Sequence, residues 1–355
     1  MENVVFSRFF LTLTAAVLLM AGCSRSGKKA ALDNGTAVLD EPNGIGRYLD
    51  ASDLADLVAV ERWPGQTGQG FKLITEHYEI CTTFMEPLVL RQLPRFMELA
   101  YQGYTAQLPV PITSTRRSTV YLFADRDQWE QFTRDFAGEH AELFCAIKEG
   151  AYCHNGACVA YNIGRTRTFS ALAHEGWHQF SGRHFKYRMP SWLDEGVAML
   201  FEQFSHENGT FRFAPQDNNY RIRDLRQTIT GRKMLPLRDL LAMNPGEVLA
   251  VDQSQAVRSL YSQWYALVRL LREGSHGARL AGYQKMLADG ANGDWPIDSI
   301  SKEIARDRNK PRTVLWNEIV GIALFKAYIE ADLDKIQREY LAFCRQIAAP
   351  KHASD

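Results

Sequence analysis

The 355-residue sequence lacks an excess of charge of either sign, because 41 Lys and Arg side chains balance 41 Asp and Glu side chains. A neutral chain has no general electrostatic attraction for a polyanion, so we do not expect nucleic acid as a partner. The composition is not that of a disordered chain either. With 46% hydrophobic residues, the protein can bury a sizeable core.

The N-terminal region has no apolar run long enough to span a bilayer comfortably. Its apolar run, residues 9–22, follows Arg8 and is typical of a secretory signal peptide, which we assign to residues 1–22. The end of this run, LLMAGC, resembles the lipobox of bacterial lipoproteins. The resemblance implies that Cys23 becomes the mature N-terminus, carries the acyl chains and anchors the protein in a lipid bilayer.

Two further features follow from that resemblance. Ser24, directly after the lipidated position, favours sorting to the periplasmic face of the outer membrane in a bacterial cell envelope. Residues 23–46 contain few large apolar side chains and are predicted to form a flexible tether behind the lipid anchor.

Cysteine is scarce, with six residues in the chain. Apart from Cys23, five remain in a compartment that permits disulfides, so at least one stays unpaired or pairs with another chain. Cys153 and Cys158 flank four residues between two apolar runs, and a disulfide between them could close a hairpin. The pairing of the remaining cysteines stays open: these are Cys81, Cys145 and Cys344.

Hydrophobic periodicity predicts an α+β domain over residues 47–355, rich in strands over 70–165 and helical over 166–348. The predicted strands cover 71–83 and 118–124, with a hairpin over 151–163. Helices are predicted over 84–102, 125–136, 169–182, 190–204, 235–243, 257–272, 279–288 and 319–347. Pro87 and Pro94 indicate a break or kink in the first helix, and Gly182 indicates the end of the third.

The sequence HEGWH at residues 174–178 carries the most specific chemistry. His174 and His178 lie one helical turn apart and can bind the same Zn²⁺ ion, while Glu175 can reach a water on that ion. A catalytic zinc normally has three protein ligands. We therefore expect a third ligand from elsewhere in the chain.

Glu195 is the candidate for that ligand. Sixteen residues separate it from His178, and it lies in WLDEGVA near the start of the next predicted helix. A loop over residues 182–189 lets this helix return beside the first one, and Gly196 permits close packing of helices. Asp194 and Glu202 are candidates to accept a hydrogen bond from the ring nitrogen of a histidine ligand that does not bind the metal.

HEGWHQF followed by WLDEGVA resembles the gluzincin zinc metallopeptidases of the aminopeptidase-like branch, and also the bacterial peptidase MA-like group of secreted proteins. The resemblance implies a thermolysin/aminopeptidase-like catalytic domain with one zinc ion per monomer, bound by His174, His178 and Glu195. It implies that Glu175 is the general base of peptide-bond hydrolysis. His184 is a rival third ligand, because metzincins place a histidine at this spacing, but the glycine of their motif is one position late here.

The resemblance also implies a tyrosine that stabilises the oxyanion. Tyr261 opens YSQWYALVRLL, whose apolar positions match the corresponding helix of the family, although Trp264 replaces its glycine; Tyr265 is the fallback. The family's aminopeptidases hold the substrate amine with a glutamate upstream, but residues 150–162 contain no acidic side chain. Exopeptidase specificity is therefore not expected. The predicted hairpin could instead pair with an extended peptide.

The sequence thus predicts a membrane-anchored zinc metallopeptidase that acts on peptides or proteins. The alternative is an inactive, zinc-stabilised binding or scaffold lipoprotein of the envelope, favoured by the missing amine-binding glutamate and the imperfect match around Tyr261.

Overall fold

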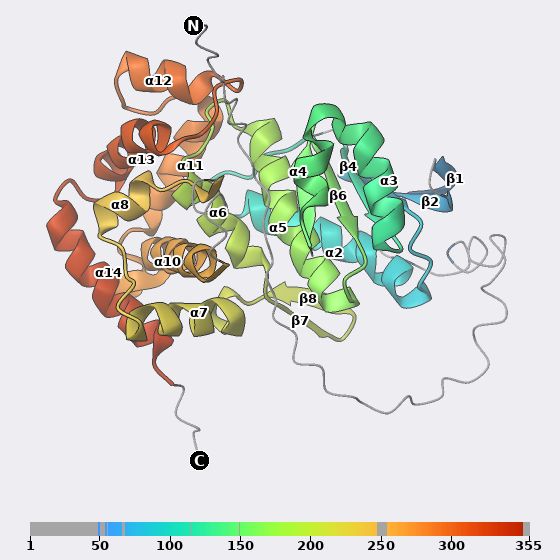
Figure 1. Cartoon of the computed structure of the whole chain (residues 1–355), viewed down its shortest axis with the longest axis horizontal. Helices are drawn as coiled ribbons and strands as arrows, with labels where there is room; N and C mark the ends of the chain where they lie inside the picture. The colour runs from blue at the N-terminus through green and yellow to red at the C-terminus, as the bar shows by residue number, and fades with distance from the viewer. Residues whose placement is uncertain are drawn as a thin grey trace, which may run out of the picture. The chain divides into compact units, whose positions relative to one another are not determined.

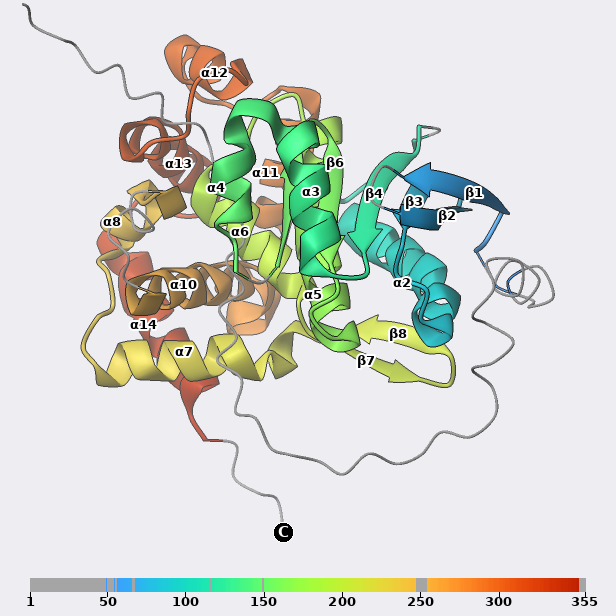
Figure 2. The ribbon, with the colours of Figure 1, turned by 45° about the vertical axis from the view of Figure 1, so that its right-hand side comes forward.

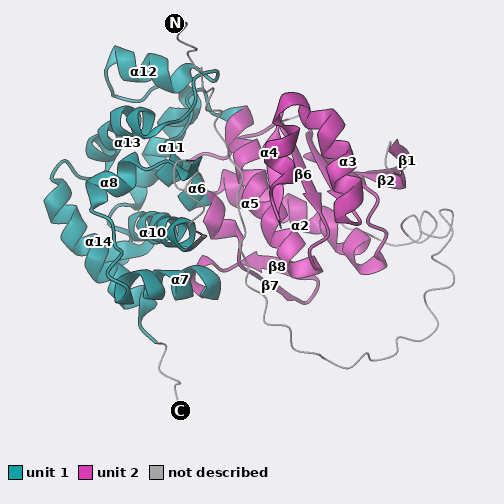
Figure 3. Ribbon diagram, viewed as in Figure 1, with its two compact units in different colours: residues 1–13, 184–197, 219–355 teal, residues 14–183, 198–218 magenta. Residues whose placement is uncertain are grey.

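The computed structural model describes residues 49, 54, 56–65, 68–114, 116–148, 150–246 and 254–350. These residues form two compact units (Figure 3). We call the described residues up to 183, together with 198–218, the sheet unit, and the remainder from 184 onward the helical unit. The predicted signal peptide, Cys23 and the tether over 23–46 lie outside the described residues. Among the described helices, none combines the length and the apolar character needed to cross a membrane.

The sheet unit is built on a mixed six-stranded sheet in the order β1-β2-β3-β4-β6-β5 (Figure 1). The parallel pairs are β3 with β4 and β4 with β6, and the other neighbours are antiparallel. The strands are β1 (Ala59–Gly65), β2 (Gly68–Ile74), β3 (Tyr78–Thr82), β4 (Ser118–Phe123), β5 (Ala151–His154) and β6 (Ala157–Tyr161). Strand β5 therefore lies at the end of the sheet.

Helices cover both faces of this sheet (Figure 2). On one face, Tyr121 of β4 contacts Phe132 of α3 (Arg126–Ala137), and Tyr152 of β5 stacks on Phe144 of α4 (Ala141–Cys145). On the other face, the ring of Tyr78 in β3 meets the edge of Tyr101 in α2 (Pro87–Thr105). Helix α5 (Arg165–His184) lies on this second face and contacts β4 and β5 through side-chain hydrogen bonds.

Several predictions for this unit are confirmed. Strand β4 matches the predicted 118–124, and β5 and β6 form the predicted hairpin. Helix α3 matches 125–136, and the Asp125 side chain caps it by accepting a hydrogen bond from the Gln128 backbone at 2.9 Å.

Other predictions for this unit are wrong. The predicted strand 71–83 is two strands, β2 and β3, joined by a turn. Helix α2 starts at Pro87, where a proline fits the first turn, and runs through Pro94. Helix α5 begins at Arg165 and continues past Gly182. The predicted helix 190–204 ends much earlier: α6 (Ser191–Ala198) and a 3₁₀ turn (Met199–Phe201) lead into a hairpin of β7 (Phe204–Glu207) and β8 (Thr210–Phe213).

The regular structure of the helical unit, in its described part, consists of α-helices and one 3₁₀ turn (Gly274–Gly277). Beside most of α6, the α-helices are α7 (Asn219–Thr230), α8 (Leu237–Ala242), α10 (Ser254–Glu273), α11 (Leu280–Asn292), α12 (Ser299–Arg306), α13 (Val314–Tyr328) and α14 (Leu333–Ala348). The prediction of one helix over 319–347 is wrong, because Asp332 caps a new helix by accepting hydrogen bonds from the Asp334 and Lys335 backbone. Helix α10 is in contact with α7, α8, α11 and α14 (Figure 1).

Helix α6 packs closely on α10 because Gly196 has no side chain. A Cβ atom at this position would lie 2.4 Å from a methyl carbon of Val268 and 3.0 Å from the carbonyl oxygen of Trp264. The predicted close packing at Gly196 is therefore confirmed, and it fixes the position of α6 along α10.

We predict that Gly196→Ala lowers the free energy of unfolding by about 1–3 kcal/mol, because the added methyl overpacks this contact. Gly182→Ala is the matched control: no described atom lies within 4 Å of an added Cβ there, so the better helix propensity of alanine should add about 0.5–1 kcal/mol. Urea unfolding of both variants measures the difference. A Gly196→Ala protein as stable as Gly182→Ala would contradict the packing described.

Candidate metal centre

Helix α5 carries the HEGWH sequence and is surrounded by protein. Every residue from Thr168 to Ser181 is buried. Gly176 lies against α2, where an added Cβ would be 2.4 Å from the Tyr104 hydroxyl oxygen, and Tyr104 donates a hydrogen bond to the Ala173 carbonyl at 2.6 Å. Trp177 packs on Tyr104 and Phe201. The two residues between Glu175 and His178 therefore anchor the helix.

His174, His178 and Glu195 form a buried group in which each residue offers one potential ligand atom, and these atoms all lie within 4.8 Å of one another. Their exposed fractions are 0%, 6% and 1%. Such a group could hold a metal ion. Among the described residues, the group includes Glu195, the third ligand predicted from the sequence. It does not include His184, the rival third ligand.

The two histidine nitrogens have the spacing expected of two ligands on one tetrahedral zinc ion. The Nε2 atoms of His174 and His178 are 3.3 Å apart. Two imidazoles bound to one tetrahedral zinc at about 2.05 Å place their nitrogens about 3.3 Å from each other. The same distance also suits a hydrogen bond between the rings, so the nearby Glu195 carboxylate is the feature that makes this a ligand set.

Glu202 orients the His174 ring. Its Oε1 atom lies 3.0 Å from His174 Nδ1, and its Oε2 atom accepts a hydrogen bond from Asn218 Nδ2 at 3.0 Å. A carboxylate accepts hydrogen bonds, so Nδ1 carries the proton and the lone pair of Nε2 is directed at the candidate site. Glu202 was one of two candidates from the sequence for this contact. Asn218 was missed, because nothing in the local sequence connects it to His174.

Asp194 is the other candidate, and its Oδ2 atom accepts a hydrogen bond from Arg312 at 2.8 Å. The ion pair is buried, with 8% of the Asp194 side chain and 10% of the Arg312 side chain exposed. Asp194 therefore acts on the start of α6.

Glu175 is fully buried beside His174, and its backbone carbonyl accepts a hydrogen bond from the Cys153 thiol at 3.0 Å. Burial raises the pKa of this thiol well above its usual value, so the thiol stays protonated and can donate. The β5–β6 hairpin thus contacts α5 at the position of the predicted general base.

Cys153 and Cys158 are directly opposed on β5 and β6. The turn between the strands has positive φ at Asn155 and Gly156, as in a type I′ hairpin. In such a hairpin the second pair from the turn lacks backbone hydrogen bonds and has close side chains, which suits a disulfide. The structure has both residues as free thiols, as it has Cys81, Cys145 and Cys344. The disulfide stays a prediction that this register favours; its formation would remove the hydrogen that the Cys153 thiol donates to the Glu175 carbonyl.

Tyr261 lies on α10, is 3% exposed and has the Arg221 guanidinium 5.4 Å from its ring centre. It precedes Trp264 by one turn and Val268 by two, so it belongs to the stripe of α10 that faces Gly196. The hydroxyl of Tyr265 accepts a hydrogen bond from Arg269 at 2.9 Å. Of the two tyrosines, Tyr261 is therefore the better candidate for a role near α6.

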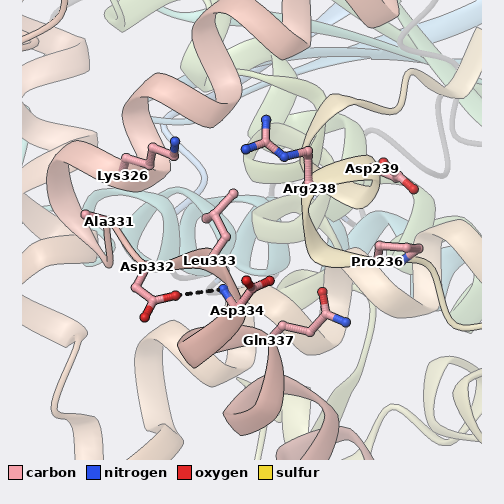
Figure 4. Close-up of a pocket in the computed structure, with 9 residues that line it drawn as sticks. All are labelled: Pro236, Arg238, Asp239, Lys326, Ala331, Asp332, Leu333, Asp334 and Gln337. Carbon is pink, nitrogen blue, oxygen red and sulfur yellow. Dashed lines mark hydrogen bonds between the residues drawn. The ribbon is translucent and has the colours of Figure 1, made fainter.

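A separate hollow of about 430 Å³ lies in the helical unit (Figure 4). Its lining has charges of both signs, and Asp332 there is already hydrogen-bonded to the backbone of α14. The lining residues are Pro236, Arg238, Asp239, Lys326, Ala331, Asp332, Leu333, Asp334 and Gln337. None of the candidate ligands belongs to it.

No protein-family model matches the chain, and no curated protein is similar to it.

We predict that Glu202→Gln weakens zinc binding about 10- to 100-fold, because an amide is a poorer partner for the His174 imidazole and is no longer anionic. Competition with a chromophoric chelator measures the affinity. Glu207→Gln, an exposed glutamate of β7, is the control and should bind zinc as the native protein does. Native affinity in Glu202→Gln would contradict the orienting role of the carboxylate.

Proposed function

We propose that the protein is a zinc-dependent metallopeptidase of the gluzincin type, anchored to a membrane through Cys23. The observation that carries the proposal is the buried convergence of His174, His178 and Glu195, with Glu175 adjacent to the first ligand. Two imidazoles and one carboxylate are the donor set of catalytic zinc sites that keep a position for water. The proposed fold is that of a thermolysin/aminopeptidase-like catalytic domain.

The three ligands would hold the ion by His174 Nε2, one ring nitrogen of His178 and one carboxylate oxygen of Glu195. Zinc bound there would acidify a water molecule and polarise the scissile carbonyl group of a peptide. The buried Glu175 carboxylate would take a proton from the attacking water. It would then deliver that proton to the nitrogen of the leaving amine.

Tyr261 is proposed as the hydroxyl that donates to the developing oxyanion. The support is its place one turn from the α10 contact with Gly196, which directly follows Glu195. The positive charge of Arg221 beside the Tyr261 ring favours a site that receives negative charge.

An extended peptide is the proposed substrate. Strand β5 lies at the end of the sheet and, among the described strands, pairs with β6 alone, so one more strand could be added on its other side. It also contacts α5 at Glu175 through Cys153. Strand addition there would bring a substrate backbone beside the general base. The lack of acidic residues over 150–162 favours recognition of the peptide backbone over recognition of a free amine.

The second candidate is a zinc-stabilised binding or scaffold lipoprotein without turnover. The observation in its favour is on α10, where Trp264 replaces the glycine of the family pattern and its indole donates a hydrogen bond to the Leu240 carbonyl at 2.9 Å. At position 264, this chain therefore has a packed tryptophan where the family's enzymes have a glycine. Zinc content alone does not separate the two candidates, but hydrolysis does.

We predict that Glu175→Gln lowers peptide hydrolysis by about 10²- to 10⁴-fold while zinc stays bound, because the amide keeps the shape of the side chain and cannot take the proton. The measurement is cleavage of a quenched fluorescent peptide library, together with elemental analysis of zinc. Glu303→Gln, on the surface of α12, is the control and should keep full activity.

Full hydrolysis by Glu175→Gln would contradict the mechanism. A native protein that holds zinc but cleaves nothing in the library would favour the binding candidate.

A further inference from the structure

Helix α6 carries the candidate ligand Glu195 but is only eight residues long. A helix of two turns has little stability of its own, so its position depends on the contacts that surround it. At its C-terminal end, Gly196 fixes α6 against α10, as described above. At its N-terminal end, α6 is contacted by residues that lie more than one hundred positions later in the sequence.

Asn317 of α13 holds the first residue of α6. Its Oδ1 atom accepts a hydrogen bond from the Ser191 backbone N–H at 2.8 Å, and its Nδ2 atom donates to Ser191 Oγ at 3.1 Å. The same Nδ2 lies within hydrogen-bond distance of the carbonyls of Met243 and Thr313. Asn317 is fully buried. It thus satisfies a backbone donor of the first helical turn from outside the helix.

Arg312 holds the next part of the same turn. Its Nη1 atom donates to the Met189 carbonyl at 3.0 Å and to Asp194 Oδ2 at 2.8 Å. One guanidinium nitrogen therefore joins the loop before α6 to the residue directly before Glu195. Because both charged side chains are almost buried, removal of either one leaves a buried charge that has lost this partner.

We propose that Arg312 and Asn317 are positioning residues for Glu195. We call their contacts with Asp194 and Ser191 the clamp, and this clamp sets how tightly the candidate centre binds its metal. The inference rests on the proposed metal centre. Neither residue is a candidate ligand; both act on the helical turn that presents Glu195. A three-residue ligand set needs its carboxylate held within a fraction of an ångström, so a looser α6 binds metal more weakly.

The test measures metal affinity and coordination in the full chain, with zinc and with Co²⁺ as a spectroscopic substitute. Asp194→Asn and Arg312→Gln each remove one charge of the buried ion pair, and Arg312→Lys keeps the positive charge. Arg279→Gln is the matched control, because it breaks another ion pair of the helical unit, with Glu339. Thermal unfolding of the metal-free proteins measures the structural cost separately.

We expect Asp194→Asn and Arg312→Gln to weaken zinc binding about 10-fold or more and to change the visible Co²⁺ spectrum. Arg312→Lys should recover most of the affinity. Arg279→Gln should bind zinc within about twofold of the native protein even if it unfolds at a lower temperature, because its ion pair includes none of the residues that hold α6.

Native zinc affinity and a native Co²⁺ spectrum in Asp194→Asn would overturn the clamp, whatever its unfolding temperature. This variant also decides the matter if Arg312→Gln does not fold. If the native protein itself binds no metal, the proposed function fails. If the native protein binds metal and the Asp194 and Arg312 variants bind it equally well, the clamp is refuted and the proposed function is not.

Discussion

The burial of ionisable side chains on α5 is the constraint on which the candidate site depends. His174 and Glu175 are fully buried, and His178 nearly so, on a helix with no exposed residue between Thr168 and Ser181. Taking carboxylates and imidazoles out of water costs free energy that must be compensated inside the protein. A divalent cation held by His174, His178 and Glu195, as we propose, would compensate it directly. The hydrogen bond between His174 and Glu202 selects the ring nitrogen that faces the candidate site.

The contacts that hold the other parts of the site differ in how far apart the contacting residues are in the sequence. Gly176 and Trp177 fix α5 through contacts within the sheet unit, and Cys153 joins the edge hairpin to the Glu175 carbonyl. Helix α6 is too short to hold its own place, and its support comes from α10 and from residues 312–317. The candidate ligands are close in sequence, whereas the contacts that hold Glu195 come from α10, about 70 positions later, and from residues 312–317, more than one hundred positions later.

This difference in range explains what the sequence could predict. The spacing within HEGWH and the position of Glu195 in WLDEGVA are local signals, and the structure groups these residues. Asn218, Arg312 and Asn317 were missed because ordinary polar residues acquire their roles through contacts distant in sequence. The β7–β8 hairpin was missed although it had a signal: Asn208 and Gly209, both with positive φ, are the dipeptide typical of a tight turn. The strand β4 and the Asp125 cap were predicted correctly, because alternation and capping are local properties.

The most direct measurement is the metal content of the purified chain from Ser24 onward, by elemental analysis of the native sequence and of Glu195→Ala. We expect about one zinc per monomer in the native protein, as for a site with three protein ligands, and its loss in the variant. No metal in the native protein after expression with ample zinc would contradict the central claim. Zinc retained in full by Glu195→Ala would show that another residue, His184 first, completes the site.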